Sequence, residues 1–334
     1  MTTRRSIGKM HVARALWYAK SGTVELRTAP LRLPQPNEAR VVTLFSGISR
    51  GTERLILNGR VPESEWQRMR APLQEGAFPF PVKYGYCATG VVEDGPEQLL
   101  GRTVFCLHPH QDMFVAPIDM LVPVPDGVPA RRATLAANME TALNAHWDAG
   151  SGPGDRIVVV GAGVVGLLVA SIAARLPGAE VTVVDVADVR RGIVESLGAK
   201  FALPNAAPGE ADVVFHTSAS AAGFNTAINC AGMEASVVEL SWYGEREVAA
   251  ALGGAFHSRR LKLISSQVGQ VAPSRRPRWT YRRRMEAAMR LLAELPALDQ
   301  LVAEEIAFTE TVKRLPEVLA DDTAGLAPVI RYQV

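Results

Sequence analysis

The chain has 334 residues and a formal net charge of +2, with 36 Lys and Arg against 34 Asp and Glu. This length allows about two domains with sizeable cores, and the near balance of charge excludes a general attraction to nucleic acid or to an anionic membrane. Cys87, Cys106 and Cys230 stand far apart, without the spacing of a disulfide framework or a zinc site, so a reducing, cytoplasmic setting is expected.

Short β-rich runs broken by glycine and proline fill the chain from Val12 to about Pro125. Such runs are typical of antiparallel strands, so we predict that a β-rich domain comes first. The predicted strands cover residues 13–18, 39–45, 89–93, 102–107 and 112–116. Alanine, leucine and methionine at helical spacing predict one helix over 130–149. Residues 1–10 carry basic side chains but no apolar run follows, so no secretion signal is expected.

A glycine-rich loop follows four consecutive apolar residues, 157–160, which predict a strand buried on both faces of a parallel sheet. The loop has the G-x-G-x-x-G spacing of a dinucleotide site. Its first glycine permits a tight turn, the second lets backbone approach a pyrophosphate, and the third lets the next helix pack on the strand. Amides at that helix start face the phosphates. The residues expected to bind cofactor here are Gly161, Gly163, Val164, Val165 and Gly166.

A second strand, 181–184, ends at Asp185. A carboxylate at this place accepts hydrogen bonds from the adenosine ribose and repels a 2′-phosphate, so NAD is favoured over NADP. Arg190 lies close enough in sequence to sit beside the ribose or to recruit that phosphate. Two other interpretations stay open: Asp185 as an ordinary turn residue, and residues 157–174 as a membrane span, against which the glycine spacing and the minimal length argue.

The alternation of strands and helices continues to about residue 271. We predict helices over 189–197 and 221–231, and strands over 200–202, 212–217, 236–242 and 261–267. Carboxyl ends of parallel strands line the cofactor crevice, so His216, Thr217 and Ser218 are expected near the adenosine half. Residues 285–295 predict a further helix, and residues 306–308 and 329–332 predict strands.

Several motifs follow one another in an order that resembles the medium-chain dehydrogenase/reductase superfamily, the alcohol-dehydrogenase-like proteins. They are GISRGTE (47–53), PVKYGYCATGVVEDG (81–95), ETALNA (140–145), the glycine loop and SLGAKFA (196–202). The resemblance implies an α/β fold with a GroES-like catalytic domain (1–131), a doubly wound Rossmann domain (132–271) and a C-terminal return to the catalytic domain (272–334). SGISRGTERL and PVKYGYCATG look more specifically like the branch containing the bacteriochlorophyllide hydroxyethyl dehydrogenases. SSQVG (265–269) resembles the segment beside the nicotinamide, which adds Ser266 and Gln267 to the expected cofactor contacts.

The zinc ligands of that superfamily are missing. The resemblance puts Ser49 at the place of the first cysteine, Tyr86 and Cys87 at those of a histidine and a glutamate, and Ala137 at that of the third ligand. Serine, tyrosine and alanine do not replace thiolate and imidazole on zinc. The four-cysteine structural loop is absent as well, so we predict that no metal binds.

Without a metal, a hydroxyl or basic side chain must stabilise the oxygen charge during hydride transfer. Tyr86 is the first candidate, although it could equally just fill the volume left by the metal. Lys83, three residues earlier, is considered as a group that lowers the pKa of Tyr86. Ser49 and Thr52 could relay a proton or simply satisfy the loop. Glu53 could orient the nicotinamide ribose, with a structural ion pair as the favoured alternative.

Three further segments have no assigned role. His108 and His110 suit proton transfer near neutrality. Residues 57–79 could cover the substrate cleft, or form an oligomer contact or a surface helix. The arginine run at 275–284 is interpreted as solvated or at an interface, ahead of a site for an anionic substrate group and well ahead of nucleic acid.

The sequence as a whole predicts a metal-free, NAD(H)-dependent oxidoreductase acting between a carbonyl and a secondary alcohol. A small-molecule substrate, no nucleic-acid or membrane partner, and a homodimer joined near residues 242–256 are expected. The alternatives are an NADPH-dependent reductase of a conjugated C=C bond and a dinucleotide-binding sensor without catalysis.

Overall fold

The computed structural model describes residues 11–320 and 325–333, and in that part the chain forms three sheets and eight α-helices. The strands are β1 (His11–Lys20), β2 (Thr23–Leu31), β3 (Glu38–Gly47), β4 (Glu75–Gly76), β5 (Val82–Lys83), β6 (Ala88–Asp94), β7 (Thr103–Cys106), β8 (Met113–Pro117), β9 (Val122–Pro123), β10 (Arg156–Val160), β11 (Glu180–Val184), β12 (Lys200–Ala202), β13 (Ala211–His216), β14 (Ala231–Glu239), β15 (Lys262–Ser265), β16 (Glu305–Ala307) and β17 (Val329–Arg331). The helices are α1 (Arg50–Leu57), α2 (Ala130–Ala133), α3 (Ala136–Ala149), α4 (Val164–Ala173), α5 (Arg191–Ser196), α6 (Ala221–Cys230), α7 (Tyr281–Glu294) and α8 (Thr311–Val318). Residues 1–10, where no secretion signal is expected, lie outside the described residues.

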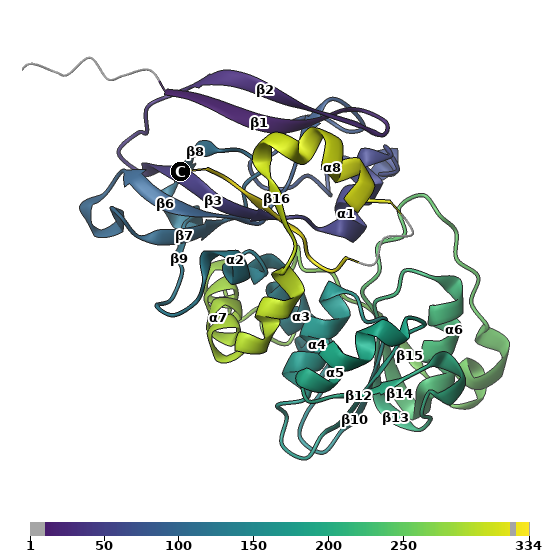
Figure 1. Cartoon of the computed structure of the whole chain (residues 1–334). Coiled ribbons are helices and arrows are strands. Elements are labelled where there is room, and N and C mark those ends of the chain that lie inside the picture. Colours follow the sequence, from purple (N-terminus) through teal and green to yellow (C-terminus); the bar gives the residue numbers. More distant parts are fainter. Residues whose placement is uncertain (1–10, 321–324, 334) are drawn as a thin grey trace, which may run out of the picture.

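A parallel sheet in the order β12–β11–β10–β13–β14–β15 forms the domain in the lower half of Figure 1. Its central strand β10 is apolar on both sides because helices cover both faces: Val159 packs in one core with α3 and α4, and Val158 and Val160 pack in another with α6. From β10 the chain adds strands first on one side (β11, β12) and then on the other (β13, β14, β15). Such a change of side between β10 and β13 leaves a crevice at the carboxyl ends of these two strands. The predicted doubly wound sheet is confirmed.

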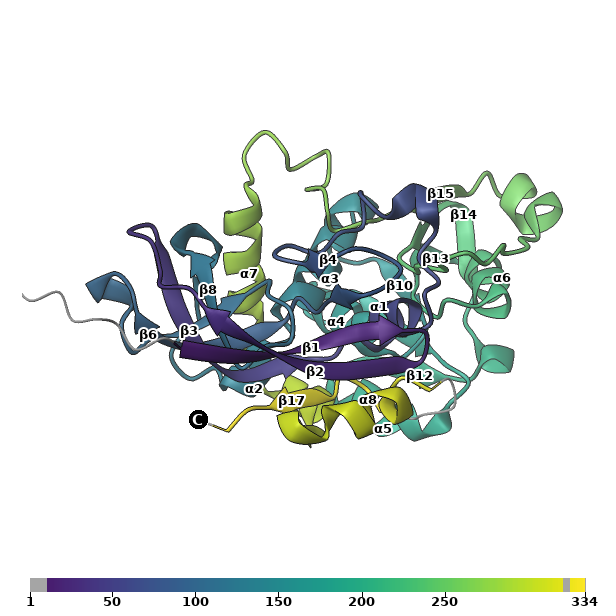
Figure 2. The same ribbon diagram turned by 90° about the horizontal axis from the view of Figure 1, so that it is seen from above.

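Two further sheets form the β-rich domain above it in Figure 1. One runs β2–β1–β5–β4, and the other runs β16–β17–β3–β6–β7–β9, with β8 also paired to β3. The last strand, β17, lies antiparallel to β3 and pairs Ile330 with Ser46, so the end of the chain closes the domain that the beginning started. Figure 2 shows the same mixture of early and late strands from above. The predicted α/β fold with a β-rich first domain is confirmed.

The single helix predicted over 130–149 is two helices, α2 and α3. Between them the Thr134 hydroxyl donates to the carbonyl oxygen of Arg131 at 2.6 Å, and the amide of Leu135 donates to Arg132. These short-range bonds tighten the chain into a turn, because a threonine side chain competes for backbone carbonyls. Helical spacing alone does not reveal such a break.

The strand predicted over 236–242 is β14, which begins and ends earlier. After β14 the Glu239 carboxylate accepts the backbone amide of Ser241 at 2.7 Å, and this bond turns the chain away from the sheet. The edge strand at this side is β15. Residues 242–256, where a dimer contact is expected, form no strand, and the dimer stays a prediction.

The arginine run is only partly exposed, because α7 begins at Tyr281 rather than at Met285. Thr280 caps the helix by accepting the Arg283 amide at 3.1 Å. Arg284 therefore points inward and is 2% exposed. Its guanidinium pairs with Glu140 at 2.8 Å, so the interpretation of the whole run as a solvated or interface face is wrong for this residue.

Residues 157–174, considered above as a membrane span, form β10, the glycine turn and the ten-residue helix α4. Across the described ranges 11–320 and 325–333, none of the helices combines the length and the apolar character needed to cross a bilayer.

Candidate functional site

The turn between β10 and α4 has the backbone geometry that its three glycines predict. Gly161 has a φ of +111°, and a Cβ there would lie 2.8 Å from Thr217 Oγ1. A Cβ on Gly166 would lie 1.9 Å from the carbonyl oxygen of Gly161. Gly163 differs, because nothing lies within 4 Å of its Cβ position. The outer glycines let the helix close onto the strand, and the middle one leaves open space beside the first amides of α4, which fits a pyrophosphate.

Asp185 follows β11 and is tied to this turn. Its carboxylate accepts the amide of Ala162 at 2.6 Å and that of Ala187 at 2.8 Å. Arg190 lies at the same end: burial lowers its pKa, and the charge of Asp185 acts in the opposite direction. The Arg190 guanidinium also donates to the carbonyl oxygen of Gly325 at 3.4 Å. The two residues considered for the adenosine ribose are therefore neighbours, as their spacing predicts.

Thr217 and Ser218 lie directly beside the glycine turn. The Thr217 hydroxyl donates to the carbonyl oxygens of Val160 and Gly161 at 3.1 and 2.9 Å, so it holds the turn in shape. Ser218 is exposed, and its hydroxyl oxygen lies 2.7 Å from His216 Nε2.

Ser266 and Gln267 follow the edge strand β15. The Ser266 hydroxyl donates to Asp148 at 2.7 Å, and the Gln267 side chain accepts the Gly269 amide at 2.6 Å. Beyond them, Arg284 donates to the carbonyl oxygens of residues 268 and 270 at 2.5 and 3.0 Å. A buried guanidinium thus fixes the segment that the resemblance puts beside the nicotinamide.

Three hydroxyl groups meet in the β-rich domain. Ser49 precedes α1, Thr52 lies in its first turn, and Tyr86 lies between β5 and β6. The Tyr86 phenol donates to Thr52 Oγ1 at 3.3 Å and is also hydrogen-bonded to Ser49. Ser49 makes no side-chain cap to α1, so its hydroxyl is not used for the helix start. All three side chains are half-buried, and we call them the hydroxyl cluster.

Burial raises the pKa of Tyr86 well above its ordinary value, and the neighbouring Cys87 adds to this, while the hydroxyls of Ser49 and Thr52 act against it. Tyr86 is therefore a neutral hydrogen-bond donor at pH 7. The suggestion that Lys83 lowers this pKa is wrong, since the Lys83 ammonium is bound by Glu75 and by Gln111.

Glu53 is completely buried beneath the hydroxyl cluster. Its carboxylate accepts the Ser49 amide at 2.7 Å, the Tyr18 hydroxyl at 2.6 Å and a hydrogen bond from His110 Nε2 at 3.0 Å. Burial by itself raises the pKa of Glu53, but the charge and hydrogen bond of His110, together with the other donors, hold it below its ordinary value. This buried hydrogen-bonded pair reaches the hydroxyl cluster through the backbone of Ser49, so Glu53 positions the cluster rather than facing a ligand.

The sequence analysis missed other members of this buried network. His110 Nδ1 lies 2.7 Å from the Ser46 hydroxyl, which lies 2.8 Å from the Tyr332 hydroxyl. Ser46 and Tyr332 are 286 positions apart, and no local pattern links them. His108 stacks on Phe114 with ring centroids 3.9 Å apart, and burial lowers its pKa to about 3. His108 is thus a neutral core residue.

The side chains at the expected zinc-ligand places do not fit a zinc ion. The Ser49 and Tyr86 side chains are hydrogen-bonded to each other, and the methyl side chain of Ala137 has no atom that can ligate a metal. The Cys87 thiol is buried, which raises its pKa and opposes the thiolate that zinc requires. Among the described residues, no three His, Cys, Asp or Glu side chains gather as a ligand set. Absence of metal from the protein itself stays a prediction.

Residues 57–79 pack between the two domains. Trp66 and Phe80 contact the core of the β-rich domain together with Tyr86 and with Trp242, which comes from the parallel-sheet domain. A Cβ on Gly244 would lie 2.6 Å from the carbonyl oxygen of residue 60, so the domains touch closely here. Next to the hydroxyl cluster, the Tyr84 ring meets the Tyr86 ring edge-on, with centroids 6.0 Å apart.

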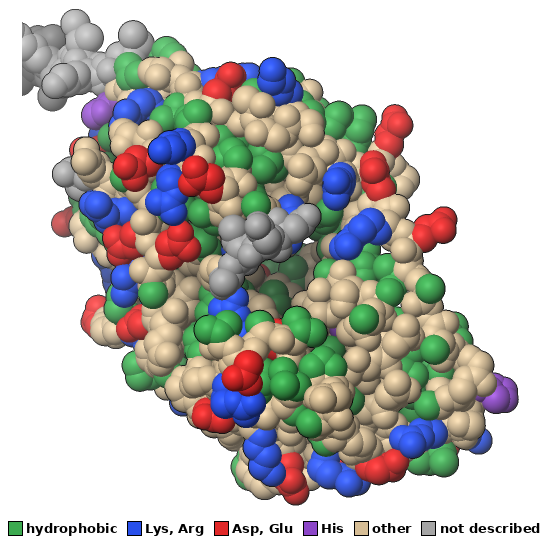
Figure 3. All heavy atoms as spheres, turned by 45° about the vertical axis from the view of Figure 1, so that its right-hand side comes forward, with side chains coloured by type: hydrophobic (Ala, Val, Ile, Leu, Met, Phe, Trp, Pro, Cys, Tyr) green, Lys and Arg blue, Asp and Glu red, His purple; other side chains and the backbone are tan. Residues whose placement is uncertain are grey.

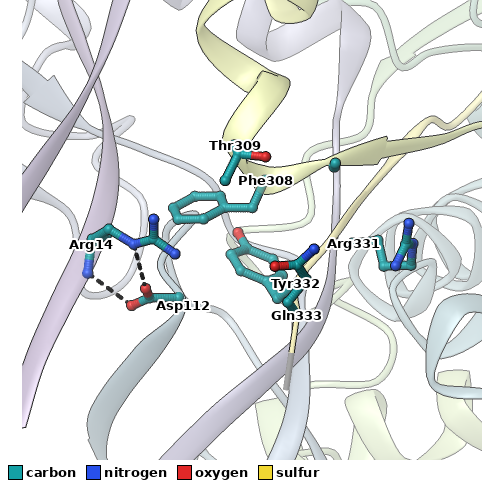
Figure 4. Close-up of a pocket in the computed structure, with 8 residues that line it drawn as sticks. Arg14, Asp112, Phe308, Thr309, Arg331, Tyr332 and Gln333 are labelled. Carbon is teal, nitrogen blue, oxygen red and sulfur yellow. Dashed lines mark hydrogen bonds and ion pairs between the residues drawn. The ribbon is translucent and has the colours of Figure 1, made fainter.

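The surface is hollowed between the β-rich domain above and the parallel-sheet domain below (Figure 3). One open pocket of about 450 Å³ lies at the end of α3, lined by Trp147, Asp148, Gln267 and Arg276 among others. A second pocket, drawn in Figure 4, has a volume of about 20 Å³. Two of its lining residues, Arg14 and Asp112, form an ion pair and a hydrogen bond with each other. That volume holds little more than one water molecule, which excludes it as a site for cofactor or substrate.

Residues 121–240 match the family model described as pyridine nucleotide-disulphide oxidoreductase, which is about a third of the chain. Solved structures match almost the whole chain. L-Idonate 5-dehydrogenase from Escherichia coli str. K-12 substr. MG1655 has 16% identity and a TM-score of 0.78, covering 97% of this chain and 99% of its own. A short chain alcohol dehydrogenase from E. coli CFT073, complexed with NADH, has 15% identity and a TM-score of 0.76, covering 96% and 99%. A protein from Sinorhizobium meliloti 1021 bound to NADP has 17% identity and a TM-score of 0.76, covering 96% and 99%.

Identities this low show the fold alone. The chain has the fold of the medium-chain dehydrogenases and reductases, with an antiparallel β-rich domain joined to a six-stranded parallel sheet.

Proposed function

We propose that this protein is a metal-independent, NAD(H)-dependent oxidoreductase that interconverts a carbonyl compound and a secondary alcohol. One observation carries the proposal: an open glycine turn with a tied acidic residue occurs in the same chain as a cluster of neutral hydroxyls. The turn suits a dinucleotide, and the cluster of Ser49, Thr52 and Tyr86 suits oxygen chemistry. The neighbours solved with NADH and with NADP support dinucleotide binding as the general class.

The bound nicotinamide supplies or accepts the hydride. In the reduction direction, Tyr86 donates a hydrogen bond and then its proton to the carbonyl oxygen as that oxygen gains charge. Thr52 and Ser49 hold the phenol in place, and the high pKa of Tyr86 keeps it protonated until the oxygen is basic enough to take the proton. Glu53 keeps Ser49 in position by accepting its backbone amide.

Cofactor and metal are tested together on the purified protein. Metal analysis is followed by fluorescence titration with NADH and with NADPH, and then by a screen of ketones and enones for NADH oxidation. We expect no stoichiometric metal, tighter binding of NADH, and turnover of a ketone. Stoichiometric zinc contradicts the metal-independent proposal. A preference for NADPH with turnover of an enone favours the double-bond reductase, and NADH binding without any turnover favours the sensor.

The hydroxyl cluster is tested with Tyr86→Phe. Loss of a general acid typically lowers turnover by about 10²–10⁴-fold, so we expect a fall of that order with unchanged NADH affinity. Tyr84→Phe is the matched control, since its ring lies 6.0 Å from that of Tyr86 and is fully buried. Turnover by Tyr86→Phe at the unaltered rate contradicts the acid role.

A further inference from the structure

A second group of reactive side chains lies at the carboxyl edge of the parallel sheet, outside the hydroxyl cluster. β13 ends at His216 and β14 ends at Glu239, and the strand register pairs these two residues directly. Ser218 follows His216 by two positions. His216 Nε2 lies 2.7 Å from Ser218 Oγ, and His216 Nδ1 lies 2.7 Å from Glu239 Oε2. A hydroxyl, an imidazole and a carboxylate are therefore linked in a line.

The direction of these hydrogen bonds follows from Glu239. Burial by itself raises the pKa of Glu239, but hydrogen bonds from His216 and Ser241 hold it below its ordinary value. The carboxylate is thus ionised at neutral pH and can only accept hydrogen bonds. His216 Nδ1 therefore donates to it, and in the neutral imidazole the lone pair of Nε2 then accepts the Ser218 hydroxyl proton. This is the arrangement of a nucleophile, a base and a group that orients the base.

The base is buried and its carboxylate largely so, whereas the nucleophile is exposed. His216 is completely buried and the Glu239 side chain is 17% exposed, whereas Ser218 is exposed. The Tyr243 hydroxyl donates to Glu239 Oε2 at 3.1 Å, and the Ser241 amide donates to Oε1 at 2.7 Å, so the carboxylate cannot turn away. A dry, fixed pair of base and carboxylate stands behind a hydroxyl that faces solvent.

The backbone supports this placement of Ser218. The chain passes from β13 through a turn into the ten-residue helix α6, and Ala219 in that turn has a φ of +51°. The first amides of a helix have no intrahelical acceptor, so the start of α6 can stabilise negative charge beside the hydroxyl. A Cβ on Gly223 would lie 2.0 Å from Ser218 Oγ and 3.0 Å from His216 Nε2. Only glycine leaves room there for the hydroxyl and the imidazole to meet.

We propose that Ser218, His216 and Glu239 form a site for acyl transfer whose substrates are carboxylic esters. The Ser218 hydroxyl proton passes to His216 Nε2 while Ser218 Oγ bonds to the carbonyl carbon. The bond from that carbon to the alcohol oxygen then breaks, and the alcohol leaves with the proton from His216. Water, deprotonated by His216 in the same way, next attacks the acyl carbon; the bond to Ser218 Oγ breaks, Ser218 Oγ takes the proton back from His216, and the carboxylic acid leaves. These steps use no cofactor, but Ser218 also lies against the glycine turn expected to bind the dinucleotide, so the activity is tested without added cofactor.

The first test uses the unaltered, full-length protein without added cofactor. Reaction with a fluorophosphonate, followed by peptide mapping, is expected to label Ser218. Hydrolysis of p-nitrophenyl acetate is expected in the same preparation, measured by release of p-nitrophenolate. A label confined to other residues overturns the proposal, and NADH binding is measured separately on unlabelled protein.

Variants then test the roles of the three side chains. Ser218→Ala and His216→Gln are each expected to lower hydrolysis about 100-fold or more, and the double variant is expected to be no slower than either, because residues that act as a unit are not additive. Ser220→Ala removes the neighbouring hydroxyl, 3.0 Å from that of Ser218, and is expected to keep most of the activity. Since Ser218 is exposed, Ser218→Ala is expected to keep the thermal midpoint of the parent. Hydrolysis by Ser218→Ala at the parent rate overturns the proposal.

Discussion

The glycine turn after β10 is held mainly by backbone, whereas the hydroxyl cluster is held by side chains from distant parts of the chain. At the turn, a Cβ on Gly166 would meet a carbonyl oxygen, and the Thr217 and Asp185 side chains bond only to backbone groups of the turn and its flanks. Beneath the hydroxyl cluster, the Glu53 carboxylate instead depends on Tyr18 and His110. The first region is therefore sensitive to added volume, and the second to the loss of a buried partner.

The largest effect is expected at the turn from Gly166→Ala. Its Cβ would lie 1.9 Å from the carbonyl oxygen of Gly161, which cannot move without opening the strand–helix contact. We expect the free energy of unfolding to fall by about 3 kcal/mol and NADH affinity to fall by about 100-fold or more, measured by urea unfolding and by fluorescence titration.

Gly163→Ala is the matched control, because its Cβ would meet nothing within 4 Å. Its free energy of unfolding is expected to stay within about 1 kcal/mol of the parent, while NADH binding weakens because the methyl group occupies the open face. An equal loss of stability in the two variants would contradict the prediction that the close carbonyl oxygen at Gly166, and the open space at Gly163, decide the effect of an added methyl group.

The next largest effect is expected beneath the hydroxyl cluster from Glu53→Gln. The substitution removes the buried carboxylate that accepts hydrogen bonds from His110 and Tyr18, which costs about 3 kcal/mol. Urea unfolding measures this loss. Glu305→Gln removes a half-exposed carboxylate that pairs with Arg131 and Arg331, and is expected to cost less than about 1 kcal/mol. If NADH affinity of folded Glu53→Gln also collapses, the two regions are not independent.

Each domain also contains one buried histidine that is expected to make its stability sensitive to acid, down to a different pH in each case. Burial lowers the pKa of His108 to about 3 and that of His146 to about 4. Both values lie below the unfolded value of 6.5, so as pH falls from 6.5 the unfolded chain binds protons that the folded chain refuses, and stability falls. Each histidine contributes a slope of up to about 1.4 kcal/mol per pH unit down to its folded pKa.

Unfolding measured between pH 7 and pH 4 checks this expectation. His108→Gln, in the β-rich domain, and His146→Gln, in the parallel-sheet domain, should each make the free energy of unfolding depend less steeply on pH. A slope that neither substitution changes assigns the acid sensitivity to other groups.

The smallest effect is expected from Asp185→Ala. Losing the carboxylate that accepts the Ala162 amide should raise the Kd for NADH by about 10-fold, equivalent to about 1.4 kcal/mol, without improving NADPH binding. Asp188→Ala removes an exposed acid three residues later, paired with Arg191, and is expected to change the Kd by less than about 2-fold. Unchanged NADH affinity in Asp185→Ala would contradict the assignment of the ribose to this end of the sheet.

The sequence by itself determined the parallel-sheet domain and its turn, because that information is local. Four apolar residues, three spaced glycines and a strand-end aspartate lie within one strand–helix–strand unit, where spacing and geometry are directly linked. Strand periodicity and turn residues likewise indicated the β-rich domain before its pairing was known.

Only the tertiary structure decided how the side chains combine. The hydrogen bonds of Tyr86 to Ser49 and Thr52, the buried partners of Glu53, and the inward turn of Arg284 join residues far apart in the chain. The line from Ser218 through His216 to Glu239 depends on the register of β13 against β14. Burial, which sets the pKa of Tyr86 and of His108, comes from the packing of whole elements, and no window of sequence contains it.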